Sequence, residues 1–184
     1  MTAKENFLEL VRAEAFGGKK LSAMQRHTIL RDNPCADAVY LFRLMQYHAA
    51  CTGRLHAYLA ARAKVKLVRR NSIFVGYKTR IGKGLLLPHP ACIILGQTVE
   101  IGENCKIFQN VTVGSRRNGE ARFGLQPHIG NDVTLFSGCA VIGAVTIGDG
   151  VQIGANAVMN RDAASGSVWA GIPAREIVKK EKAT

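Results

Sequence analysis

Apolar residues recur at every sixth position through most of the second half of the chain, and this spacing constrains the fold more than any other feature. Glycine directly follows several of these residues, and small residues recur two positions before the next one. A six-residue repeat predicts a solenoid in which three short strands make one turn of a triangular prism. We expect glycine at the prism corners, where it tolerates positive φ. The repeating residues, called anchors below, are expected to point into the prism: Leu95, Ile101, Ile107, Val113, Ile129, Leu135, Val141, Ile147, Ile153 and Met159.

The repeat is interrupted in two places. Leu87 and Leu95 are eight positions apart, so two extra residues fall within the stretch "LPHPACII". Val113 and Ile129 are sixteen apart, so ten residues are inserted in the polar, glycine-rich stretch "GSRRNGEARFGLQPH". We expect that insertion to leave the prism as a surface loop. The first interruption contains His89 between two prolines, which restrict the backbone on both sides and predict a fixed imidazole at a functional site.

The first 70 residues lack the six-residue repeat and show helical spacing instead. Four helices are predicted at about 5–16, 21–32, 35–53 and 54–70. The first helix is expected to bury Phe7, Leu8, Val11 and Phe16. We therefore predict an α-helical region over 1–72, a mainly β prism over 73–177 with an inserted loop at about 114–128, and a basic tail over 178–184.

The formal net charge is +12, and residues 1–80 carry +10 of it. This basic region predicts peripheral contact with an anionic membrane surface or an acidic glycan. No nucleic-acid-binding motif accompanies the charge, so we expect no nucleic-acid partner. The chain shows neither a secretory signal nor an apolar run long enough to span a membrane, which predicts a cytoplasmic protein.

The five cysteines are odd in number and contain no C-x-x-C pair, so we expect reduced thiols and no structural metal. Cys92 lies close to His89 in the sequence. An acyl-enzyme formed on Cys92 is conceivable, but we favour a role as a small packing residue in the coil.

Several motifs occur together in the second half: "LLLPHPACIILGQTVEIGENCKIFQNVTVG", "IGDGVQIGANAV" and the closing "GIPAR". In combination they resemble the serine O-acetyltransferase branch of the hexapeptide acyltransferases, which also contains polysaccharide O-acetyltransferases, over about residues 73–177. The resemblance implies a left-handed parallel β-helix, a homotrimer and acetyl-CoA as cosubstrate without a metal. It also implies that His89 is the general base, a role that suits imidazole near neutral pH. The cofactor-binding residues that it implies are Gly114, Ser137, Ala155, Arg175 and Lys179.

The resemblance also implies departures from this branch, both around the histidine and where the branch binds the amino-acid substrate. Pro88 stands where the branch usually has an acidic residue just before the histidine, and Phe74 where it has an acidic residue that orients the imidazole. Leu125 and Gln126 stand where it has an Arg-His pair that holds a carboxylate. We therefore predict an acceptor without a carboxylate, most simply a sugar hydroxyl of a surface polysaccharide or its precursor.

Four residues are predicted to bind the acceptor: Arg116, Arg117, Gln126 and His128. Serine O-acetylation in cysteine biosynthesis remains the alternative. Arg116, Arg117 or Arg122 can replace the family's arginine as the cation that holds the carboxylate of serine. A non-catalytic scaffold and a γ-type carbonic anhydrase are weaker alternatives; the latter needs three histidines, and the prism has two.

Overall fold

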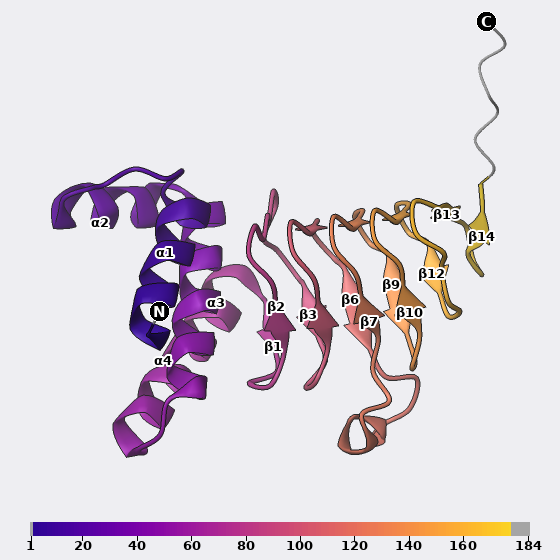
Figure 1. Ribbon diagram of the computed structural model, residues 1–184, viewed down its shortest axis with the longest axis horizontal. Coiled ribbons are helices and arrows are strands. Elements are labelled where there is room, and N and C mark those ends of the chain that lie inside the picture. The colour runs from indigo at the N-terminus through magenta and orange to yellow at the C-terminus, as the bar shows by residue number, and fades with distance from the viewer. Residues whose placement is uncertain (1, 178–184) are drawn as a thin grey trace, which may run out of the picture.

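The computed structural model describes residues 2–177 and places a group of helices at one end of a stack of coils (Figure 1). The helices are α1 (Ala3–Ala15), α2 (Ala23–Asp32), α3 (Pro34–Ala50) and α4 (Arg54–Asn71). Thr2 and Ser22 begin α1 and α2 with capping boxes, and Asn33 caps α3 ahead of Pro34. No helix within residues 2–177 is long and apolar enough to cross a bilayer.

The coils build three parallel sheets, one for each face of a triangular prism. Sheet A contains β1 (Phe74–Val75), β3 (Ile94–Leu95), β6 (Thr112–Gly114), β9 (Ala140–Ile142) and β12 (Val158–Met159). Sheet B contains β2 (Arg80–Ile81), β4 (Glu100–Ile101), β7 (His128–Ile129) and β10 (Thr146–Ile147). Sheet C contains β5 (Lys106–Ile107), β8 (Thr134–Leu135), β11 (Gln152–Ile153), β13 (Val168–Ala170) and the antiparallel β14 (Arg175–Glu176).

The predicted anchors fill the centre of the prism. Leu95 stacks on Val113 in sheet A, and Ile101 stacks on Ile129 in sheet B. Each anchor is almost completely buried, whereas most residues directly before an anchor are at least partly exposed. The six-residue spacing therefore predicted both the strands and their register.

The glycines that follow the anchors have a different role from the one expected. Gly82 and Gly102 do not have positive φ. A Cβ on Gly82 would lie 2.8 Å from the carbonyl carbon of Gly102 in the next coil, which is too close for any side chain. Positive φ occurs two residues later in the corner, for example at Asn110 and Asn156. Glycine is thus required by the close approach of stacked coils and not by the corner conformation.

The helices pack on the first coil through a buried ion pair. The Arg43 guanidinium donates two hydrogen bonds of 2.7 Å to the Glu14 carboxylate, and both side chains are at most 3% exposed. Arg43 also donates to the carbonyls of Ile81 and Gly82, at 2.8 and 2.6 Å. Glu14 accepts from the amide of Gly84 at 2.7 Å. The pair therefore satisfies backbone groups of the first coil that have no preceding coil to pair with.

Two details of the helical region differ from the prediction. Leu8 is 50% exposed, whereas Phe7 stacks on Tyr47 with ring centroids 5.1 Å apart. His48 and His56, predicted to be ordinary helix-face residues, face each other with Nδ1 atoms 2.8 Å apart and join α3 to α4. Burial, followed by the neighbouring His56, lowers the pKa of His48.

Replacing Glu14 by alanine should strongly destabilise the protein, because it leaves the buried Arg43 guanidinium unpaired. We expect the free energy of unfolding, measured by urea titration, to fall by about 3–5 kcal/mol. Asp32→Ala is the matched control, since it removes only an exposed ion pair with Arg31 and should leave the free energy of unfolding nearly unchanged. Equal losses in the two variants would show that the buried pair does not hold the helices on the coil.

Candidate active site

His89 lies on a two-residue bulge where the chain passes from sheet C of the first coil to sheet A of the second coil. Leu86 pairs with Lys106 before the bulge, and the Ala91 carbonyl accepts from the Asn110 amide after it. Pro88 therefore corresponds to Phe108 and Ala91 to Gln109, which leaves His89 and Pro90 as the two inserted residues. The bulge pushes the imidazole out of the stack, and His89 is exposed.

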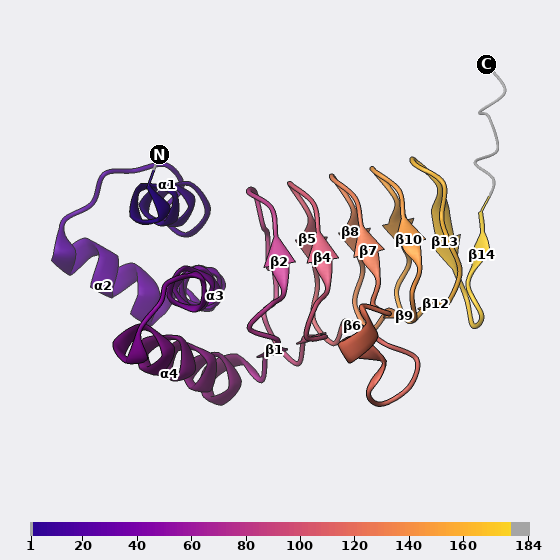
Figure 2. The same ribbon diagram turned by 60° about the horizontal axis from the view of Figure 1, so that its bottom comes forward.

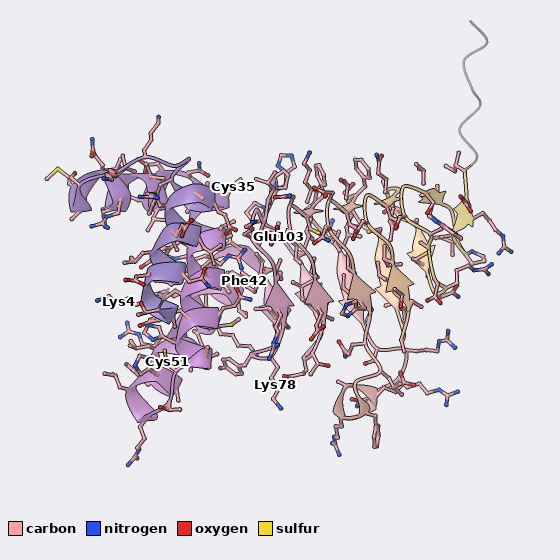
Figure 3. All side chains as sticks on the ribbon, viewed as in Figure 1. Lys4, Cys35, Phe42, Cys51, Lys78 and Glu103 are labelled. Atoms are coloured by element: carbon pink, nitrogen blue, oxygen red, sulfur yellow. The ribbon has the colours of Figure 1, made fainter. Side chains whose placement is uncertain are left out.

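The helices hold the bulge at both ends. The Cys35 thiol at the start of α3 lies 3.1 Å from the Pro88 carbonyl oxygen, to which it donates a hydrogen bond. Figure 3 shows Cys35 on the side of the helices that faces the first coil. The Asn71 carbonyl at the end of α4 accepts from the Cys92 amide at 3.1 Å. Pro90 is buried between these two contacts, so the backbone around His89 is fixed from within the chain.

The imidazole itself has no hydrogen-bond partner among residues 2–177. Its nearest aromatic neighbour is Phe108, with ring centroids 6.3 Å apart. Phe74, which the resemblance places at the position of an acidic residue, is 50% exposed on β1 and carries no proton acceptor. Both ring nitrogens are therefore free to bind substrate groups, and backbone restraint takes the place of an orienting carboxylate.

Three predicted cofactor residues follow His89 along one edge of the prism, called the C-to-A edge because the chain passes there from sheet C to sheet A. The Gln109 carbonyl accepts from the Gly138 amide, and the Ser137 carbonyl accepts from the Asn156 amide. Ser137 and Ala155 therefore lie in line with the bulge, two and three coils away. Because neighbouring strands are about 4.8 Å apart, Ala155 is about 14 Å from the bulge along the prism. Arg175 pairs with Ala170 near the same edge, whereas Lys179 lies outside the described residues.

Gly114 and the predicted acceptor residues of the loop lie on a different edge. Gly114 ends β6, where the chain leaves sheet A for sheet B, so we call this the A-to-B edge. The loop projects from it and contains the short helix η1 (Glu120–Phe123), as Figure 2 shows. Lys78, at the same edge of the first coil, points to the same side in Figure 3. One chain therefore does not bring Arg116 and Arg117 to His89.

Gln126 and His128 are also separated from His89. The Gln126 side chain is 8% exposed and packs over Gly96, and its Oε1 has no partner among the described residues. His128 lies on β7 of sheet B, where its Nδ1 is 3.2 Å from Glu100 Oε2. Neither side chain faces the bulge within one chain.

The two edges border the same face of the prism, and that face is apolar. Phe74 and Ile94 are 50% and 46% exposed on sheet A, followed on the later coils by Thr112, Ala140 and Val158. Sheet B instead presents Arg80, Glu100, His128 and Thr146. Sheet A is therefore the face suited to contact another protein surface.

The sequence also contained a signal that the prediction missed. Glycine follows the anchors Ile129, Ile147 and Ile153, but phenylalanine follows Ile107 and Leu135. The structure stacks these rings, Phe108 and Phe136, on the C-to-A edge beside His89 with centroids 5.4 Å apart.

The cysteines separate into two groups. Burial raises the pKa of the Cys105 thiol to about 11 and that of Cys139 to about 12. These two fit the prediction of small packing residues. Cys92 does not: it is exposed at the end of the His89 bulge with φ 54°, the left-handed corner conformation that Asn110 and Asn156 adopt on later coils.

Cys92→Asn should retain the acetyl transfer that the resemblance implies, because asparagine adopts the left-handed conformation readily and direct attack by the acceptor requires no enzyme nucleophile. We expect kcat within about threefold of wild type, since only an exposed side chain changes. The measurement is thiol release from acetyl-CoA. Loss of turnover together with an unchanged Tm would instead identify Cys92 as an acyl-enzyme nucleophile.

Comparison with known proteins places the chain in a family. The pattern of the family "Bacterial transferase hexapeptide (six repeats)" matches residues 126–161. The serine acetyltransferase of Helicobacter pylori strain J99 is 35% identical over 159 residues, which cover 86% of this chain and 90% of that protein. A serine acetyltransferase of Staphylococcus aureus strain Mu50 is 37% identical over 128 residues, covering 67% of this chain and 57% of its own length.

Solved structures show the same fold. A serine acetyltransferase in complex with CoA has a TM-score of 0.72 at 17% identity, covering 95% of this chain and 71% of that one. Soybean serine acetyltransferase complexed with serine has a TM-score of 0.74 at 22% identity, covering 93% of this chain and 69% of that one. The solved structures share the fold, and the Helicobacter pylori protein matches most of the length of both chains. The chain therefore belongs to the serine acetyltransferase family of hexapeptide-repeat transferases, which are O-acetyltransferases.

Proposed function

We propose that the protein transfers the acetyl group of acetyl-CoA to the hydroxyl of L-serine, with His89 as general base. The observation that carries this proposal is the 35% identity to a serine acetyltransferase over 86% of the chain. The relatives do not support the polysaccharide acceptor expected from the sequence. They favour serine, which the sequence left as the alternative.

The chemistry follows from the position of His89. The exposed imidazole accepts the proton of the acceptor hydroxyl while the hydroxyl oxygen attacks the thioester carbon. The carbon–sulfur bond then breaks, and the protonated imidazole returns the proton to the departing thiolate. A base positioned in this way contributes roughly 10²–10⁴-fold to the rate.

The donor is proposed to lie along the C-to-A edge. Its thioester reaches His89, its flexible arm passes Ser137 and Ala155, and its phosphates approach Arg175. The small side chains on this edge leave room for the arm, and a guanidinium suits phosphate. A structural neighbour with the same fold is a complex with CoA, which supports a CoA site in this architecture.

We infer that the site is completed by a second copy in a homotrimer of left-handed prisms. His89 and the inserted loop border opposite edges of the apolar sheet A. Packing sheet A against neighbouring copies would bury Phe74 and Ile94 and bring the loop of one copy to the C-to-A edge of the next. Gly114, Arg116 and Arg117 would then approach a neighbour's His89.

The carboxylate of serine needs a cation in this arrangement, because Leu125 occupies the position of the family's arginine. Arg116 and Arg117 on the loop are the proposed replacements. Leu125 and the inward-facing Gln126 favour a second candidate acceptor without a carboxylate, a sugar hydroxyl.

Replacing His89 by asparagine should abolish acetyl transfer without unfolding the protein, because the side chain is exposed. We expect kcat to fall by about 10²–10⁴-fold, measured by thiol release. His27→Asn, on the exposed face of α2, is the matched control. If His89→Asn retained more than about a tenth of wild-type kcat, general-base catalysis by His89 would be wrong.

An acceptor panel tests the substrate. Acetyl-CoA is offered with L-serine, free sugars, nucleotide sugars and acidic oligosaccharides, and we expect the highest kcat/KM with L-serine. Arg116→Gln or Arg117→Gln should raise the KM for serine by about ten- to a hundredfold, the effect of one charge-assisted hydrogen bond. Faster turnover of a saccharide than of serine would replace serine by the second candidate.

A further inference from the structure

Two phenylalanine rings lie on the C-to-A edge, on the coils between His89 and Ala155. The His89 and Phe108 rings are 6.3 Å apart, and Phe108 and Phe136 are 5.4 Å apart with an interplanar angle of 18°. The three rings form a continuous row, called the aromatic row below. Each comes from a different coil.

Backbone hydrogen bonds fix the order of this row. The Phe108 amide donates to the Leu135 carbonyl, and the Phe136 amide donates to the Ile153 carbonyl, both at 3.0 Å. Phe136 is therefore stacked directly between Phe108 and Gly154. The coil spacing of about 4.8 Å puts Phe136 about 10 Å from the bulge. A donor that runs from Ala155 past Ser137 to His89 therefore passes directly beside both phenylalanines.

The coil itself does not require aromatic rings at these positions. On the next coil the equivalent residue is Gly154, and on the first coil it is Pro88. Phe108 and Phe136 point away from the prism axis and are half-buried, so part of each ring remains accessible. The edge thus changes from small residues at Ala155 to an apolar surface near His89.

We propose that the aromatic row binds the thioester end of the acyl donor, with Phe136 as a positioning residue for it. This proposal rests on the proposed function, which supplies acetyl-CoA as the donor. The cysteamine methylenes next to the sulfur are apolar, and they match an aromatic surface. The small residues farther along the edge leave room for the more polar arm.

A truncated donor separates this site from the rest of the groove. S-acetyl-N-acetylcysteamine keeps the thioester and the cysteamine but lacks the longer arm and the phosphates. Phe136→Ala should lower kcat/KM about tenfold for both this donor and acetyl-CoA, the effect of one lost aromatic contact. Ala155→Trp should lower it for acetyl-CoA alone, because that site lies beyond the reach of the truncated donor. Phe136→Tyr, which keeps the ring, should restore most of the loss.

Direct binding of CoA, measured by calorimetry, tests the same inference without an acceptor. We expect Phe136→Ala to raise the Kd of CoA about tenfold. Tyr58→Ala is the control, because that ring is 56% exposed on α4, in the helical region and away from both edges of sheet A. Thermal unfolding of each variant shows whether the fold is kept.

The outcomes distinguish the inference from the function on which it rests. If wild type does not bind CoA, the proposed function fails and the inference fails with it. If wild type binds CoA and Phe136→Ala matches it in CoA affinity and in kcat/KM for the truncated donor, the inference alone is overturned. A lower Tm with unchanged donor kinetics would show that the ring only stabilises the corner.

Discussion

The pairing of each coil with the next is the constraint on which the rest of the structure depends. Strands of two or three residues have no stability alone, so their backbone groups must be satisfied by the coil above and the coil below. The first coil lacks a coil before it. Arg43 and Glu14 supply the missing donors and acceptors from the helices, which makes this buried ion pair a continuation of the backbone ladder.

The same constraint limits where a functional group can be placed. Inside the prism the positions are filled by the anchors and by the small buried residues between them, and at the corners Gly82 and Gly102 have no room even for a Cβ. Chemistry is therefore confined to the edges, where extra residues can leave the stack without breaking the ladder. The chain uses this freedom twice, at His89 and at the long loop, and the two insertions lie on either side of sheet A.

The family relationship and the residues near His89 carry different information. Identity of 35% over most of the chain establishes the fold and the class of reaction. We infer from the resemblance that Phe74 and Pro88 stand where the family has acidic residues, and Leu125 where it has the arginine that holds a carboxylate. Cys35 and Asn71 bind the bulge through its backbone instead, so the orientation of His89 rests on the packing of α3 and α4.

The sequence by itself determined the coils, the two insertions and the position of His89 at the first of them, because a period of six with glycine at fixed places leaves few folds. It did not reveal that glycine is needed for close coil contact, that Cys92 is exposed, or that His48 faces His56. It also did not show that Gln126 turns inward or that His128 lies on sheet B. The facts about the coils depend on the edge that each corner residue occupies, which is decided only when coils distant in sequence stack on one another. The contact between His48 and His56 likewise depends on the packing of α3 against α4.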